Sequence, residues 1–218
     1  MAMRYWIPLF LIGLASCASE QKGVEYDMDS MEYKTIQSNK YLRRGRSIYD
    51  RLISKPNVRA EDFEEAIQVW NEGLKILPTN TLIRYEIVKV LYHLGKAYMK
   101  RMYICNTQAQ KAKENGDFEL AQKKIQEGKL EEQKAIDAYT RFLKHITILL
   151  RHRKPHDRQE EEMFFEWMVI ANIQIKRFQE ALRLIQERLA ELTPSSPKYH
   201  ALVRVKEEIQ KEIEKQNL

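Results

Sequence analysis

The segment EDFEEAIQVWNEGLKILP, residues 61–78, carries the pattern that decides the fold. Its apolar residues recur with the period of a helix and are Phe63, Ala66, Ile67, Val69, Trp70, Leu74 and Leu77. This spacing puts them along one face of an α-helix, and Pro78 ends the helix because proline has no amide hydrogen to donate. Residues 31–55 have the same periodicity and stop before Pro56. The two segments together predict a helix hairpin.

The composition favours long helices in the rest of the chain. The 218 residues include only seven glycines and six prolines, the residues that mark most turns. A sheet of short strands would need many more turns. Between Thr81 and Glu114 only Gly95 interrupts the helical pattern, which predicts one helix of about 50 Å. We therefore expect an all-α domain over residues 31–218, built of antiparallel hairpins with unusually long helices.

The segment at residues 61–78 also resembles the second half of a tetratricopeptide repeat, a unit of two antiparallel helices. The matching residues are Phe63, Ala66, Trp70, Gly73 and Pro78. Weaker copies of the pattern contain Phe118 with Ala121 and Phe178 with Ala181, and Gly95 matches a small residue of the first helix. The resemblance implies that these residues pack helix against helix and that the hairpins stack as a short right-handed solenoid.

The spacing of the copies differs from that of the family. Phe63, Phe118 and Phe178 lie 55 and 60 residues apart, whereas the family repeats about every 34 residues. A generic antiparallel bundle is the alternative.

Residues 198–218 form the expected last helix, with one narrow apolar stripe that contains Leu202, Val205, Ile209 and Ile213. A helix that is polar on its other faces suits the capped end of a solenoid.

Residues 81–150 predict a long hairpin with uneven apolar content. Residues 82–105 are apolar on nearly every side, so we expect them to be buried. Residues 106–134 hold few large apolar side chains and turn at Asn115-Gly116. They predict a projecting helical finger, which either contacts a partner or is a solvated extension. The basic connection RHRKPHDR at residues 151–158 is either an ordinary loop or a contact for anionic lipid headgroups.

The first 17 residues indicate export and lipid attachment. One arginine, an apolar run from Tyr5 to Leu14 and small residues make up a secretory signal over residues 1–16. The stretch Leu14-Ala15-Ser16-Cys17 resembles the lipobox of bacterial lipoproteins. That resemblance implies cleavage before Cys17 and a lipid on its thiol, with residues 17–30 as a flexible tether. An ordinary cleaved signal is the alternative.

The resemblance also implies a place for the protein in the cell. Ala18 follows the cysteine, which in the enteric pattern implies the outer membrane, facing the periplasm. Net charge is +6, from 37 basic and 31 acidic residues that are mostly interleaved along helices. A nucleic-acid binder usually concentrates its basic charge on one face, so nucleic acid is not an expected partner. Expected partners are the membrane, through the lipid, and proteins of the envelope.

The sequence contains no catalytic, phosphate-binding or metal-binding motif, so we expect neither enzyme activity nor a cofactor or metal. Tetratricopeptide proteins bind partners along the inner face of their first helices. Carried over from Gly95, this implies a groove formed by Lys89, Tyr92, His93, Lys96, Met99 and Lys100. Lysines beside a tyrosine would suit an acidic peptide end or another anionic group. Solvated lysines and a packed Tyr92 and His93 are the alternative.

The expected function is therefore that of an adaptor or assembly factor held at the bacterial cell envelope. A ligand-binding accessory lipoprotein of a transport system is the second possibility, and an envelope-remodelling enzyme is the third. An open groove or an exposed finger favours the first, and a closed apolar pocket favours the second. Converging, desolvated carboxylates would favour the third.

Overall fold

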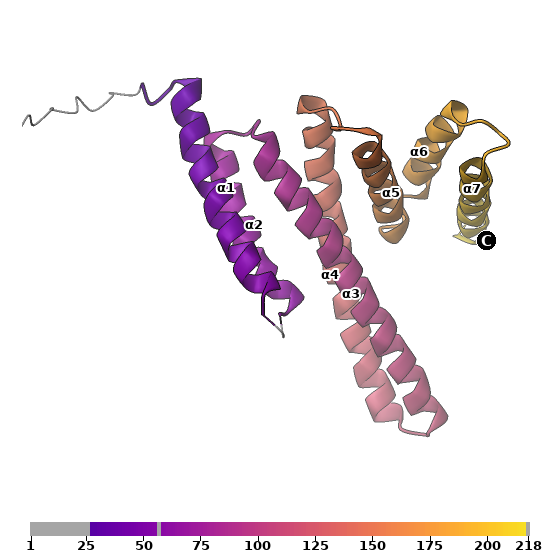
Figure 1. Ribbon diagram of the computed structural model, residues 1–218. Coiled ribbons are helices and arrows are strands. Elements are labelled where there is room, and N and C mark those ends of the chain that lie inside the picture. Colours follow the sequence, from indigo (N-terminus) through magenta and orange to yellow (C-terminus); the bar gives the residue numbers. More distant parts are fainter. Residues whose placement is uncertain (1–26, 56–57, 217–218) are drawn as a thin grey trace, which may run out of the picture.

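The computed structural model describes residues 27–55 and 58–216, and this part of the chain is all-helical, as expected (Figure 1). It contains no strand. Cys17 and the expected signal peptide lie outside these residues. The elements are α1 (Met31–Ile53), the 3-10 helix η1 (Ala60–Phe63), α2 (Glu64–Ile76), α3 (Thr81–Glu114), α4 (Phe118–His152), α5 (Arg158–Gln174), α6 (Phe178–Glu191) and α7 (Pro197–Gln216).

Polar caps fix where four of the helices begin. The side chains of Ser30, Asn80, Asp117 and Asp157 accept hydrogen bonds from backbone amides in the first turns of α1, α3, α4 and α5. These amides have no partner within their own helix, so each cap stabilises its helix by about 1 kcal/mol. Between α3 and α4 the chain turns at Gly116, whose φ of +79° suits glycine. The turn is where the sequence predicts it.

The stretch at residues 61–78 packs α2 against α1. Trp70 is fully buried, and its Nε1 donates a hydrogen bond to the carbonyl oxygen of Leu42, 3.2 Å away. Ala66 is fully buried as well. A Cβ on Gly73 would lie 2.8 Å from the Cβ of Tyr41, so glycine is what lets the two backbones approach. The small and aromatic residues of this stretch thus lie between helices.

Helices α3 and α4 run antiparallel and form the longest contact in the molecule (Figure 1). Gly95 faces Tyr139, and Asn106 faces Gly128 further along the pair. The main core uses this pair from Ile83 to Tyr98 and from Ala135 to Leu149. Beyond the core the pair continues as residues 106–134, which we call the finger. Its buried contacts include three alanines, Ala109, Ala112 and Ala121.

A second, smaller core joins α5, α6 and α7. Its buried residues are Val169, Ala181, Leu182, Ile185 and Ile209. In Figure 1 the three helices follow one another away from the upper half of α3 and α4. Leu202, Val205 and Ile213 of α7 pack against this cluster. The apolar stripe of the last helix therefore faces inward.

Two expectations about burial are wrong. Leu82, Tyr103 and Ile104 lie in the stretch expected to be buried, yet 51%, 61% and 48% of their surfaces are exposed. Tyr103 and Ile104 are exposed because α5 is shorter than α3 and leaves this side of it uncovered, whereas Leu82 lies in the first turn of α3. Phe118 was expected to pack between helices, but it is 71% exposed at the start of α4, beside the tip of the finger.

The other residues assigned to helix packing are buried or half-buried, apart from Pro78, which is exposed just after α2. Phe63 and Phe178 are half-buried, and Ala181 is fully buried. None of the helices in the described residues is both long and apolar enough to cross a membrane.

Candidate functional site

A groove runs along α3 beside the end of α5, with a volume of about 670 Å³. We call it the α3–α5 groove. Nine of its residues come from α3 and follow one another at helical intervals, so they form a single stripe on one face of that helix. The lining residues are Tyr92, Lys96, Met99, Lys100, Tyr103, Ile104, Thr107, Gln108 and Lys111 of α3, Tyr139 of α4, and Ile170 and Gln174 of α5.

The groove exists because α5 is half as long as α3. The two helices have 17 and 34 residues, or about 26 and 51 Å at 1.5 Å per residue. Helix α5 ends at Gln174, and the chain then turns back into α6. Below that point Figure 1 shows that α3 and α4 continue together, and that α5, α6 and α7 do not reach so far. The uncovered side of α3 is the wall of the groove.

Packed aromatic rings close the end of the groove nearest the start of α3, which we call its upper end. The ring of Tyr92 stacks on Trp167 of α5, with centroids 4.4 Å apart and planes 14° from parallel. Tyr139 contacts Tyr92 edge to face, at 6.2 Å between centroids. A Cβ on Gly95 would lie 2.7 Å from the Tyr139 ring, so glycine makes room for it. The packing of these rings gives this end of the groove its shape.

Burial reinforces the neutral state that the two tyrosines at this end already have at physiological pH. It raises the pKa of Tyr92, and the charge of Glu166 on α5 raises that pKa further. Burial likewise raises the pKa of Tyr139, with a smaller contribution from Tyr92. Both phenols therefore stay neutral at physiological pH. They add aromatic surface and a neutral hydroxyl to the groove, and no negative charge.

The lower part of the groove is open to solvent and contains an exposed apolar patch among polar side chains. Tyr103 and Ile104 are largely exposed, and Ile170 of α5 is 37% exposed. Met99 lies half-buried between the aromatic end and this patch. Exposed apolar side chains that gather in one concavity are typical of a binding surface, whereas scattered ones are not.

Three lysines give the groove its charge. Lys96, Lys100 and Lys111 all line it and are exposed. Within the described part of the chain none of the three makes an ion pair, and the lining includes no acidic side chain. The ammonium of Lys96 lies 5.7 Å from the centre of the Tyr92 ring. The groove thus combines apolar surface with cations that are free to meet a negatively charged ligand.

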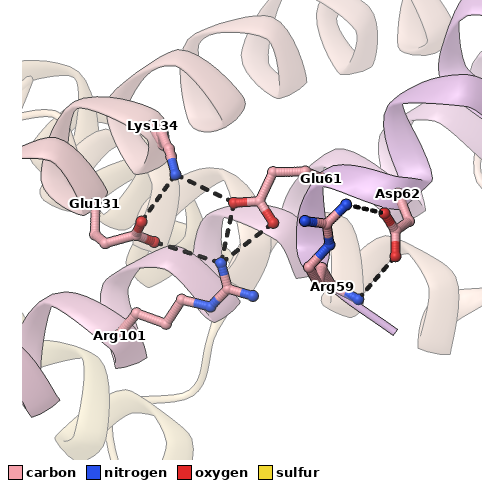
Figure 2. A network of polar contacts seen from close by, with 6 residues as sticks. All are labelled: Arg59, Glu61, Asp62, Arg101, Glu131 and Lys134. Carbon is pink, nitrogen blue, oxygen red and sulfur yellow. Dashed lines mark hydrogen bonds and ion pairs between the residues drawn. The ribbon is translucent and has the colours of Figure 1, made fainter. Parts of the chain in front are cut away.

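On another side of α3 the cations are paired, as Figure 2 shows. Glu61 of η1 lies 3.0 Å from Nη1 of Arg101 on α3 and 3.1 Å from Nζ of Lys134 on α4. Glu131 of α4 lies 2.9 Å from the same lysine and 3.6 Å from the same arginine. We call these four residues the clamp, because they join three elements at the base of the finger.

The clamp neutralises its own charges. Burial alone would raise the pKa of Glu61, but hydrogen bonds and the charges of Arg101 and Lys134 outweigh it and lower the pKa. Next to the clamp, Asp62 accepts a hydrogen bond from the backbone amide of Arg59 and so caps η1. Carboxylates that are ionised and paired hold a structure together better than they transfer protons. The clamp therefore has a structural role.

Four of the six predicted groove residues line the α3–α5 groove: Tyr92, Lys96, Met99 and Lys100. Lys89 lies outside it, 3.3 Å from Oε2 of Glu86. His93 also lies outside and lines a cavity of about 230 Å³ that faces α1 and η1. Burial, then the charges of Lys96 and Lys89, lower its pKa. Lys89 precedes the groove along α3, and His93 faces α1 and η1 instead.

Sequence reasoning missed the lower part of the groove. Tyr103, Thr107 and Lys111 continue the stripe of Met99 at helical spacing, and that signal was available. Tyr139 and Ile170 had no such signal, because only the packing of α4 and α5 brings them to this face.

The remaining predicted feature is the basic connection at residues 151–158. Arg153 is not free, since it binds Glu160 at 3.0 Å and lies over the ring of Tyr85. Arg151 and Lys154 are exposed. Among the described residues no three His, Cys, Asp or Glu side chains come together as metal ligands would. The chain matches none of the protein-family models, curated proteins or solved structures with which it was compared.

Proposed function

We propose that this protein is a lipid-anchored, tetratricopeptide-like adaptor or assembly factor of the bacterial cell envelope. In this proposal Cys17 carries the lipid, and the α3–α5 groove binds a partner protein near the membrane. The observation that carries the binding role is the exposed apolar patch within the α3 stripe, with Tyr103 61% and Ile104 48% exposed beside three unpaired lysines. Binding a partner removes such apolar surface from water, which favours the complex.

Two further observations support the repeat-like part of the proposal. Ala66, Trp70 and Gly73, which carry the resemblance, lie buried where α1 meets α2. Each helix from α3 to α7 also contacts the next helix in the chain, which is the neighbour-to-neighbour packing of repeat proteins. The lipid anchor is supported by the sequence Leu14-Ala15-Ser16-Cys17 alone.

The shape of the site favours an adaptor over the two alternatives. A small-molecule carrier calls for a closed apolar pocket, whereas the α3–α5 groove is open along Tyr103 and Ile104. An enzyme calls for converging carboxylates with unusual protonation. The carboxylates of Glu61 and Glu131 do converge, but Arg101 and Lys134 neutralise them.

Photo-crosslinking in intact cells tests the binding role. A photoreactive amino acid placed at Tyr103 is expected to capture one major protein partner. The matched control is the same amino acid at Leu130, which is 59% exposed on the finger and outside the groove. Equal capture from both positions, or none from Tyr103, would contradict the proposed binding surface.

Fractionation of the same cells tests the anchor. The Cys17→Ser variant is expected to leave the membrane fraction, whereas a Cys105→Ser variant is expected to stay in it. Cys105 is a free cysteine within α3 and serves as the control for thiol loss. If Cys17→Ser stays in the membrane fraction as the wild type does, the anchoring proposal is wrong.

A further inference from the structure

We infer that the occupant of the α3–α5 groove is an amphipathic α-helix of a partner protein, with an apolar stripe and carboxylates along its flank. This inference rests on the proposed function, because it names the chemistry of the partner at the same site. The structure gives three independent reasons for it, which concern length, backbone and charge.

The uncovered length of α3 matches a short helix. The stripe runs from Tyr92 to Lys111, or about 28 Å along the helix axis. The end of α5 covers its upper part, where Trp167 stacks on Tyr92. From Met99 to Lys111 the stripe continues for about 18 Å, which a helix of about 12 residues would cover. The occupant would thus stand where a longer α5 would have stood.

The backbone of the groove favours a helical occupant over an extended one. The lining residues belong to three α-helices, whose interior amide and carbonyl groups bond within their own helix. An extended peptide would find no backbone partners along this wall. A helix satisfies its own backbone and needs only side-chain contacts. The spacing of the α3 stripe suits interdigitation with a second helix.

The positive charge of the groove favours an amphipathic helix that carries carboxylates over one that carries lysines. Lys96, Lys100 and Lys111 lie along the stripe without an acidic residue in the lining, so carboxylates on the occupant would find partners and lysines would be repelled. A second copy of this chain docked through the same stripe would bring lysines face to face. Residues 18–30 of this chain have carboxylates, but their sequence ASEQKGVEYDMDS lacks a helical apolar stripe.

Two synthetic peptides of opposite charge test this chemistry directly. Both are 14-residue fluorescent helices with the same Leu and Ala stripe, flanked by Glu in one and by Lys in the other. Binding is measured by fluorescence anisotropy to the full-length protein in nanodiscs of neutral phosphatidylcholine, with empty nanodiscs as the blank. The Glu peptide is expected to bind at least about fivefold more tightly than the Lys peptide.

Charge reversal in the groove is the decisive variant. Lys96→Glu combined with Lys100→Glu is expected to reverse the preference between the two peptides. Lys113→Glu with Lys129→Glu is the matched control, because these exposed lysines of the finger lie outside the groove and change the net charge equally. Unchanged circular dichroism shows that each variant folds. Ile104→Asp is expected to weaken both peptides, since both use the apolar patch.

The outcomes separate this inference from the proposed function. Equal binding of both peptides, or a reversal in the control variant as well, overturns the acidic helix as occupant. Partner capture from Tyr103 in cells would still support the adaptor role in that case. Conversely, peptide preference without any partner captured in cells would support the chemistry of the groove and contradict the adaptor. Crosslinks from Tyr103 to lipid or to a second copy of the chain overturn the inference too.

Discussion

Gly45 and Trp70 meet where α1 packs on α2, and the missing side chain of the glycine decides how closely the helices approach. A Cβ at Gly45 would lie 2.1 Å from Nε1 of Trp70 and 2.4 Å from its Cδ1. The indole cannot move aside freely, because it is fully buried and bonded to the carbonyl oxygen of Leu42. Any larger residue at position 45 must therefore push the two helices apart.

We predict that Gly45→Ala destabilises the protein by about 1–3 kcal/mol, because overpacking outweighs the better helix propensity of alanine. Urea denaturation followed by circular dichroism measures the change. The matched control is Gly128→Ala, also within a helix. There the one close contact of a Cβ would be Oδ1 of Asn106 at 2.8 Å, the end of a side chain that can rotate away, and Cβ of Cys105 at 3.5 Å is at ordinary contact distance. That variant is expected to be neutral or more stable, and similar losses in both variants would contradict the argument.

A half-buried histidine at the α3–α4 contact should make stability depend on pH. Burial, and then the charges of Arg84, Arg141 and Lys144, lower the pKa of His145 to about 4. The unfolded chain takes up this proton near pH 6.5, but the folded chain does so only near pH 4. The unfolded state therefore binds more protons between these values, and the folded state loses stability as the pH falls through this window.

The expected loss between pH 6.5 and 4 is up to about 3 kcal/mol. Urea denaturation midpoints at pH 7.5, 5.5 and 4.5 measure it. His145→Gln is expected to flatten the profile in this range, with a smaller slope left by His93, whose pKa is also lowered. If the variant keeps the full slope of the wild type, His145 is not the group that titrates.

Helical spacing accounts for part of the groove lining, although Lys89 and His93 of the same helix lie outside the groove. Tyr92, Lys96, Met99 and Lys100 share one face of α3, and helical spacing alone places them together. The contribution of Ile170 depends on the point at which α5 ends beside α3, which no local pattern encodes.

At the scale of elements, the clamp shown in Figure 2 holds the base of the finger against η1. Glu61 is the member of the clamp that belongs to η1, and it contacts both Arg101 of α3 and Lys134 of α4. The three side chains are 33–39% exposed, so solvent weakens each pair. The clamp still differs from isolated surface pairs, because one carboxylate joins two helices that are also held by Glu131.

We predict that Glu61→Gln lowers the free energy of unfolding by about 1 kcal/mol, because Arg101 and Lys134 lose their shared counter-charge. Hydrogen exchange should increase in η1 and at the base of the finger. The control is Glu72→Gln, which removes an exposed pair with Lys75 inside α2 and should change stability by less than about 0.5 kcal/mol. Equal effects of the two variants would show that the clamp adds nothing beyond a surface ion pair.

The ends of α3 were predictable, and its surroundings were not. The chain after Pro78 and the turn at Asn115-Gly116 delimit the helix at the residues seen in the structure. The burial of α3 was overestimated because the apolar Tyr103 and Ile104 lie beyond the end of α5. The apolar content of a helix predicts that its surface is buried, but it does not predict whether the same chain or a partner buries it.

At the scale of the whole molecule, the described residues form two apolar clusters, and this division governs how the structure should open. The main cluster includes residues of α1 to α5, and the smaller one joins α5, α6 and α7. Polar contacts reinforce the second cluster, since Arg188 of α6 lies 2.9 Å from Glu161 of α5, and Lys198 of α7 pairs with Glu162. Such partly exposed pairs contribute little, so apolar burial sets the stability of each part.

We predict that α6 and α7 open at a lower free energy than α3 and α4, because fewer buried side chains hold them. Ile185 and Ile87 are both fully buried, one in each cluster. Replacing either with alanine costs about 2–5 kcal/mol locally. Hydrogen exchange by mass spectrometry should then show that Ile185→Ala speeds exchange in α6 and α7 alone, whereas Ile87→Ala lowers protection in α1 to α4 as well. Uniform acceleration by Ile185→Ala would mean that the two clusters unfold as one cooperative unit.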